Sequence, residues 1–305
     1  MADDDMRPRP VPPPAGSSRG ERRPGKHRPM GALWADTFSV VGKRWRDLAV
    51  AAIVGSAILL VALVAGLVGV DELFDGQFWE KIDALFSGEI QTSAEIDAWM
   101  ASFQLTLSPQ ALSLLIAALV ASFLAILQAA ASAQVARQEL SGMDAGGNAA
   151  MSIAISRLPV LLLVNLVLFT MQAVVFGINV GLNAVAYPLG VLWDVVTLVV
   201  MAVAAPLLTI LWVMAYLEPG VPSLRRWVGL LGRSKAATWG RVVLLDLVRM
   251  ILAAAVFFVL MVSTVPFAYA LAIVIVLVWP LTVGVVTVAQ VIMYEDLASD
   301  SSGAC

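Results

Sequence analysis

Charged residues are missing from long stretches of this sequence, and histidine and cysteine are almost absent. No Asp, Glu, Lys, Arg or His occurs in 48–70, 98–136, 158–193, 195–217 or 250–294. The one cysteine, Cys305, excludes an intramolecular disulfide and a cysteine-rich metal site. The one histidine, His27, excludes a catalyst that needs paired histidines. Zinc-ligand spacings, a nucleophile elbow and a P-loop are missing too, so we expect no catalytic residue, no metal site and no cofactor.

The uncharged stretches are long and apolar enough to cross a membrane. Hydrophobic residues make up 60% of the chain and charged residues 13%, and the mean hydropathy is +0.88. A spanning helix needs about 20 apolar residues, so the last stretch is too long for one span. We therefore predict an all-α membrane protein with six transmembrane helices in three hairpins. The predicted spans are about 48–70, 109–135, 158–185, 193–217, 241–263 and 268–293, the last with a kink at Pro280.

Short amphipathic or basic segments precede the odd-numbered spans, at 33–46, 148–157 and 223–239. Each is expected to form a short helix lying in the membrane interface. In the first, Trp34, Phe38, Val41 and Trp45 share one helical face. The membrane domain then covers 31–297. Residues 1–30, rich in Pro, Arg, Gly and Ser, are expected to be a disordered tail, and 298–305 a polar tail.

The connection 71–108 carries eight acidic residues and a single basic one, Lys81. Apolar residues at helical spacing predict two short amphipathic helices, the second beginning at a capping box formed by Thr92 and Glu95. The acids have no calcium-binding spacing, so an ordinary solvated face is favoured over a cation site.

The basic residues fix the expected orientation. With the N-terminus inside and six spans, 18 of the 19 Lys and Arg residues lie on or near the cytoplasmic side. The positive-inside rule therefore predicts that both termini are cytoplasmic. The basic N-terminal tail can contact anionic lipid, although a solvated tail is the favoured interpretation.

Two sets of polar residues fall inside predicted spans. Asn165, Gln172 and Asn179 repeat every seven residues and are expected to face other helices. Asp246 and Arg249 lie three residues apart, about 8 and 12 Å deep if Arg241 marks the inner boundary. We expect this pair to interact and to face the helix bundle. Structural pairing is favoured for both sets, and a solute or proton path is the alternative.

The chain resembles the bacterial membrane proteins named after the glycerophosphoryl diester phosphodiesterase membrane domain. The similarity rests on short segments near the membrane borders: Leu33–Asp47, Ala205-Pro206, Glu218-Pro219-Gly220, Leu224–Trp227, Trp239–Arg241 and Tyr294–Leu297. This resemblance implies a six-span membrane domain over about 31–297 without the catalytic domain that is fused to it in some relatives. It implies no settled activity for the membrane part.

These observations lead to an expected function class. We expect a non-enzymatic multi-pass protein of the bacterial cytoplasmic membrane with a structural, accessory or lipid-organising role. The alternative is a transporter or channel for a small solute or a lipid. Membrane lipids are the expected partners, with a protein partner or a second copy of the chain as further candidates. No nucleic acid is expected.

Overall fold

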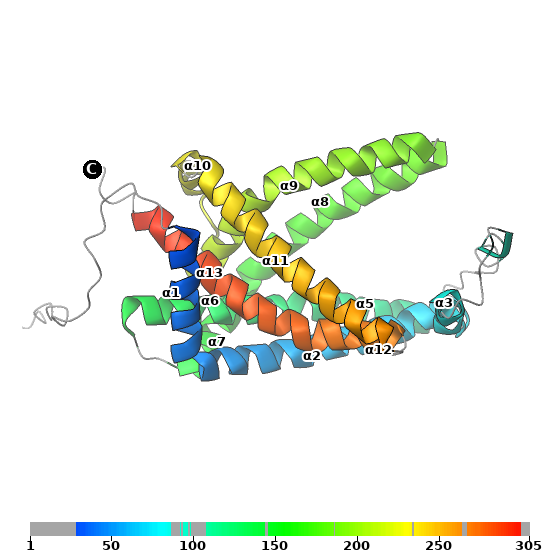
Figure 1. Cartoon of the computed structure of the whole chain (residues 1–305), viewed down its shortest axis with the longest axis horizontal. Helices are drawn as coiled ribbons and strands as arrows, with labels where there is room; N and C mark the ends of the chain where they lie inside the picture. The colour runs from blue at the N-terminus through cyan, green and yellow to red at the C-terminus, as the bar shows by residue number, and fades with distance from the viewer. Residues whose placement is uncertain are drawn as a thin grey trace, which may run out of the picture.

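The structure is a computed structural model that describes residues 29–86, 92, 94–96, 98, 108–143, 146–185, 187–233, 235–263 and 267–299. Within these residues every regular element is a helix (Figure 1). Five of the helices are long and apolar enough to cross a membrane: Trp45–Leu73, Pro109–Ser141, Leu158–Asn179, Gly240–Leu260 and Val274–Ala298. The predicted all-α membrane protein is confirmed, whereas the count of six spans stays a prediction.

The long helices follow one another along the chain, two of them in consecutive segments. Their bounds are α2 (Trp45–Leu73), α5 (Pro109–Leu124) continued by α6 (Ile126–Ser141), α8 (Leu158–Val185), α9 (Tyr187–Leu217), α11 (Lys235–Val262), and α12 (Phe267–Ile273) continued through a π-helical turn (Val274–Val278) into α13 (Trp279–Ser299). The short helices are α1 (Met30–Lys43), α3 (Phe78–Phe86), α7 (Gly146–Ser156) and α10 (Leu224–Arg233). The expected fourth span, 193–217, lies inside α9.

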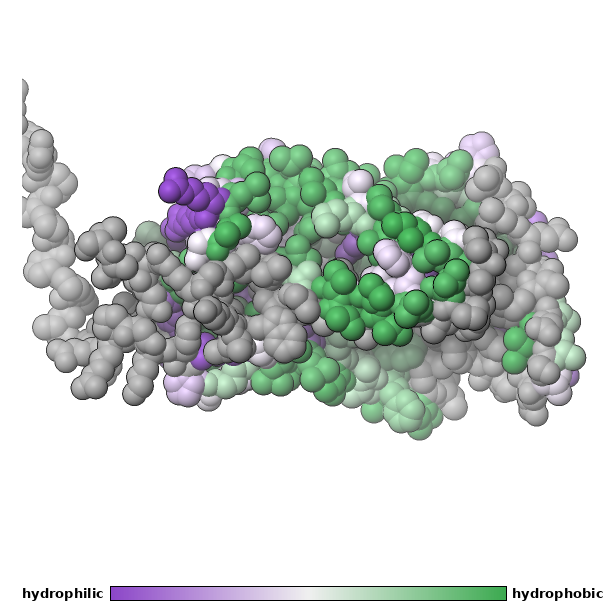
Figure 2. Space-filling model, turned by 90° about the horizontal axis from the view of Figure 1, so that it is seen from above, coloured by the Kyte–Doolittle hydropathy of each residue, from purple (hydrophilic) through white to green (hydrophobic). Residues whose placement is uncertain are grey.

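The helices form a bundle with one projecting arm (Figure 1). Helix α2 packs along α5 and α6, and α13 packs on both α2 and α6. Helices α8 and α9 pack on each other and diverge from the rest toward the ends at which they are joined to each other. Short helices α1, α7 and α10 gather at one end, and α3 lies at the other. Figure 2 shows that the face seen from above is mostly apolar, as a lipid-facing surface requires.

Helix α2 fits closely against its neighbours because small residues line its buried side. Ala51, Gly55 and Ala62 are buried there, and small residues let a neighbouring helix approach closely. A Cβ added to Gly55 would lie 2.2 Å from Oε1 of Gln128 on α6. Gln128 is only 2% exposed, and its amide nitrogen donates to the carbonyl oxygen of Pro280. Glycine at position 55 therefore makes room for an amide that joins α6 to α13.

The C-terminal end of α9 is capped by side chains from other parts of the chain. Gln134 donates to the carbonyl oxygen of Tyr216, Arg137 to that of Leu217 at 2.5 Å, and Arg157 to that of Glu218 at 2.6 Å. The last carbonyls of a helix have no partners within it, and cationic donors also suit its negative dipole end. Burial, followed by the nearby Arg137 charge, lowers the pKa of Arg157, while Glu218 raises it.

The carboxylate of Glu218 extends this cap to two further helices. It forms an ion pair of 3.2 Å with Arg226 of α10 and accepts a hydrogen bond from the hydroxyl of Tyr294 on α13. The stretch Glu218-Pro219-Gly220, which the sequence places between a span and a basic segment, therefore ties α9 to α10 and α13.

Several boundaries differ from the expected ones. Helix α9 begins at Tyr187 rather than near 193, and the second span has a break at Ala125. The helix that begins at Met30 ends at Lys43, and Arg44 is not helical. Trp45 therefore belongs to α2 and does not lie on the helical face that carries Trp34. The reason is tertiary: α1 buries Leu33, Thr37 and Val40 and lies across the end of the bundle, packed against α13.

Other local expectations hold. Helix α8 spans 158–185 as predicted, with Pro159 in its first turn, where a missing N–H does no harm. Thr92 and Glu95 form the expected reciprocal capping bonds at 2.9 and 3.3 Å. A π-helical turn ends just before Pro280, where a kink is expected. The second amphipathic helix of 71–108 and the disordered tail fall largely outside the described residues.

Candidate functional site

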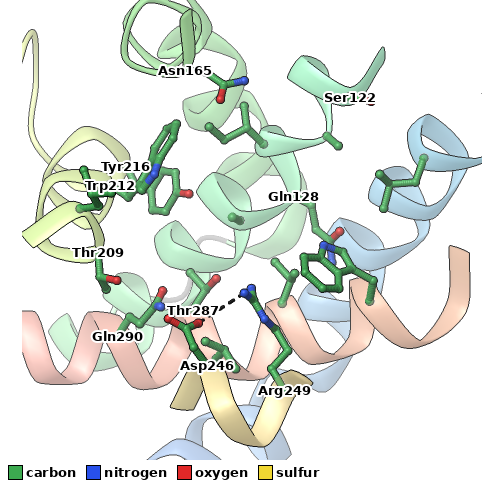
Figure 3. A pocket seen from close by; sticks show the side chains of 18 residues that line it. Ser122, Gln128, Asn165, Thr209, Trp212, Tyr216, Asp246, Arg249, Thr287 and Gln290 are labelled. Carbon is green, nitrogen blue, oxygen red and sulfur yellow. Dashed lines mark ion pairs between the residues drawn. The ribbon is translucent and has the colours of Figure 1, made fainter. Parts of the chain in front are cut away.

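A cavity of about 460 Å³ lies among the spanning helices where α8 and α9 diverge from α11 and α13 (Figure 3). Its walls come from α2, α5, α6, α8, α9, α11 and α13. Many of its lining side chains are polar, which is unusual between apolar helices. The uncharged polar ones, apart from tyrosine and tryptophan, are Ser122, Gln128, Asn165, Thr209, Thr287 and Gln290.

Two charges of α11 enter this cavity. Leu245 is fully buried and packs with Val286 and Ala289 of α13, which turns the neighbouring positions of α11 toward the cavity. Asp246 and Arg249 lie there, with Nη2 of Arg249 3.4 Å from Oδ1 of Asp246. Their side chains are 30% and 24% exposed. The expected interaction between them is present, and both face the bundle.

The ion pair lies within one helix, so it does not itself join α11 to a neighbour. That contact comes from Trp279 of α13, whose ring centroid lies 4.4 Å from the guanidinium carbon of Arg249. A cation over an indole face is attracted by the ring quadrupole, and more strongly where water is scarce. Arg249 therefore bridges Asp246 on its own helix and Trp279 on α13.

The guanidinium of Arg249 retains hydrogen-bonding capacity. Its Nε is buried and has no hydrogen-bond partner in the described part of the chain. The 3.4 Å separation from Asp246 is also longer than the usual 2.7–2.9 Å of a charge-assisted hydrogen bond. Figure 3 shows the guanidinium and the hydroxyl of Tyr216 both directed into the cavity. The site can therefore accept a ligand that brings its own acceptor oxygens.

Aromatic side chains complete the cavity wall. Trp212 and Tyr216 of α9 stack with their ring centroids 5.8 Å apart, and both line the cavity together with Trp279. The cap at the end of α9 fixes Tyr216, because the backbone oxygen of this residue accepts from Gln134. Rings of this kind offer both apolar surface and a face that attracts cations.

The amide row has a mixed outcome. Asn165 lines the cavity, and Asn179 donates to the carboxylate of Asp194 on α9 at 2.5 Å. The expectation is wrong for Gln172, whose side chain is exposed. The reason is the divergence of the arm, since the C-terminal part of α8 has α9 as its main neighbour. A seven-residue repeat predicts that the three amides lie on the same side of α8. It does not predict which part of that side a neighbouring helix covers.

Sequence reasoning missed much of the cavity. Gln128, Trp212, Tyr216 and Trp279 all line it, yet none of them stands out by spacing. Two signals were present in the sequence. Gln128 is a large amide within the uncharged stretch 98–136, and Trp279 directly precedes Pro280 within the uncharged stretch 250–294.

Comparison with protein-family models, curated proteins and solved structures found no match. No group of three or more His, Cys, Asp and Glu side chains suited to a metal ion occurs in the ranges that the structure describes. The functional interpretation therefore rests on the geometry of this chain.

We predict that Asp246 and Arg249 are energetically coupled. Asp246→Asn leaves the Arg249 charge without its counter-ion among apolar helices, so it should lower the thermal unfolding midpoint of the purified protein in detergent. Adding Arg249→Gln should restore part of the loss, with a coupling energy of about 0.5–3 kcal/mol. The same Asp246→Asn change combined with Arg225→Gln, which removes an exposed arginine of α10, should be additive. Additive effects for the Asp246 and Arg249 changes would show that the two residues are not partners.

Proposed function

We propose that the chain is a non-enzymatic multi-pass protein of the bacterial cytoplasmic membrane that organises membrane lipid, as a structural or accessory component. The observation that carries this proposal is the position of the polar cavity. Its walls are the apolar helices themselves, so its contents come from the membrane or pass through it. A binding site in the lipid phase suits a protein that handles lipid.

The orientation is part of the proposal. Arg44, Arg137, Arg157 and Arg226 lie near α1, α7 or α10, the short helices at one end of the bundle in Figure 1. Lys81 lies on α3 at the opposite end. This distribution supports a cytoplasmic location for the arginine-rich end and for both termini.

Single cysteines test this orientation. After Cys305→Ser, the change Gln77→Cys places a thiol between α2 and α3, and Gly229→Cys places one on α10, where the added atom meets no neighbour. A membrane-impermeant thiol reagent should label intact cells at position 77 and not at position 229. Both positions should react after the cells are permeabilised. Labelling of intact cells at 229 and not at 77 would invert the proposed topology.

The resemblance to the glycerophosphoryl diester phosphodiesterase membrane-domain proteins supports a role without catalysis. That resemblance concerns a membrane part that exists with or without a catalytic domain. The only histidine of the chain is His27, which leaves no histidine pair for a phosphodiesterase centre. A protein partner or a second copy of the chain would have ample apolar surface to contact, because large exposed apolar residues such as Ile116, Met171 and Val199 occur on most long helices.

Transport of a small solute or a lipid is the second candidate. The observation that favours it is the irregular helix from α12 to α13, whose π-helical turn Val274–Val278 leads directly into Trp279 and Pro280. Interrupted helices beside polar groups are common at transport sites. The ion pair of Asp246 and Arg249 supplies such polar groups.

A deletion strain separates the two functions. Loss of the gene should change the fraction of amine-bearing phospholipid that an impermeant amine reagent labels on intact cells, or the phospholipid composition. The wild-type gene should restore both values, and uptake of small solutes should remain at the parental level. A defect in solute uptake with unchanged lipid would favour transport and contradict the proposed role. Unchanged lipid and unchanged uptake would also contradict it.

A further inference from the structure

We propose that the polar cavity and an adjoining apolar groove form one binding site for a phospholipid whose headgroup carries both a phosphate and an ammonium group. This inference rests on the proposed lipid-organising function and names the ligand of its site. It follows from three observations: the two lining residues that the cavity and the groove share, the contrast between their polar groups, and the paired charges in the cavity.

The groove has a volume of about 330 Å³ and shares Leu59 and Ser122 with the cavity. It follows α2 from Leu59 to Val70 and is closed on its sides by Ala118 and Ile275. At about 1.5 Å per helical residue, these eleven steps extend about 16 Å. A hollow of that length is suited to an extended acyl chain.

The groove and the cavity differ in whether their polar groups have hydrogen-bond partners within the protein. In the groove, the Ser122 hydroxyl donates to the carbonyl of Ala118 at 2.8 Å, and the Trp79 indole donates to that of Leu67 at 3.0 Å. These groups have their partners within the protein, which leaves the groove apolar toward a ligand. In the cavity, by contrast, the buried Nε of Arg249 has no partner in the described residues. A polar cavity beside an apolar groove matches the polar headgroup and the apolar chain of an amphiphilic ligand.

The charges of the cavity select the headgroup. Asp246 and Arg249 carry opposite charges 3.4 Å apart, so a ligand with only one charge would be attracted by one residue and repelled by the other. A zwitterion avoids this when its phosphate approaches the guanidinium of Arg249 and its ammonium approaches Asp246. Arginine suits the phosphate because it presents several donors in a fixed plane. Trp212 and Tyr216 offer aromatic faces to the ammonium.

The direction of the site agrees with the proposed topology. The groove leads from Leu59 toward Val70 and Trp79, which lie near α3 at the outer end. The cavity includes Tyr216 and Gln290, which are closer to the inner end. A bound lipid would therefore have its headgroup on the cytoplasmic side of its chain, in the direction of inner-leaflet lipid. It would be displaced outward, because the groove begins at Leu59 in the middle of α2.

Gly66 lies at the wall of the groove, where α2 packs on α5. A Cβ added at this residue would lie 3.5 Å from Cβ of Ala118, which also lines the groove, and this distance is ordinary contact. An alanine is therefore tolerated, whereas the larger side chain of leucine would fill the space meant for the lipid chain. Gly177 of α8 provides a matched control, because nothing lies within 4 Å of its added Cβ.

Native mass spectrometry of the purified full-length chain in a mild detergent tests the proposal. With added phosphatidylethanolamine, one lipid should be retained per chain, and phosphatidylglycerol should be retained more weakly. Arg249→Gln and Gly66→Leu should each weaken retention about tenfold or more, the loss that a hydrogen bond to a charged group or a buried chain segment would produce. Arg225→Gln and Gly177→Leu should leave it unchanged. Tyr216→Phe, which keeps the capped backbone, provides a second cavity variant if Arg249→Gln does not fold.

Each other outcome overturns part or all of the proposal. No retained phosphatidylethanolamine, or equal retention by cavity, groove and control variants, would remove the site altogether. Equal retention of phosphatidylglycerol would refute the zwitterionic headgroup. Glycerophosphoethanolamine without chains should bind much more weakly, and equally tight binding would exclude the groove. Failure of lipid binding while the deletion strain still shows altered lipid would overturn only this inference. Tight binding with normal lipid in the deletion strain would overturn only the proposed function.

Discussion

The hydrogen bonds at the C-terminal end of α9 join this helix to the core of the bundle, in which Ile210, Met214 and Leu217 are also buried. In the lipid core no water completes an unpaired carbonyl, so a helix that ends close to it must find donors in other segments. Gln134, Arg137 and Arg157 supply these donors to Tyr216, Leu217 and Glu218. Since α8 and α9 diverge from the bundle toward the ends at which they are joined to each other, this cap is one of the links between the arm and the bundle. It also fixes Tyr216 at the wall of the cavity.

The charges of α11 need a different explanation. An ion pair among apolar helices contributes little to stability, because removing two charges from water offsets much of their attraction. Asp246 and Arg249 are also separated by 3.4 Å, which is loose for such a pair. A zwitterionic ligand that completes the hydrogen bonds of Asp246 and Arg249 would explain why the two charges lie in the cavity at this distance. The same ligand would explain why the polar cavity adjoins an apolar groove.

The sequence predicts the features of this structure that depend on local rules. Hydropathy predicts the helical membrane fold and the bounds 158–185 of α8. The three-residue spacing of Asp246 and Arg249 predicts their contact. Features that depend on how helices meet were not predictable. Gln172 shares the side of Asn165 on α8 and yet is exposed. The reason is that the direction in which α8 diverges depends on contacts far away in the sequence.

The cavity wall shows the same limit. Gln128 reaches Pro280 only because Gly55 on a third helix has no side chain at the point of contact. The contact among Gly55, Gln128 and Pro280 involves three segments that are far apart in the sequence. The break of the second span at Ala125 likewise has no proline or glycine beside it. One chain without aligned relatives carries no signal for such junctions.

The most direct test of the central claim is an experimental density map of the full-length chain in a lipid nanodisc that contains phosphatidylethanolamine. We predict an elongated density with its larger end beside Arg249 and Asp246 and its narrow end along α2 from Leu59 to Val70. Isolated water peaks in the cavity, together with protein side chains closing the groove, would contradict the claim.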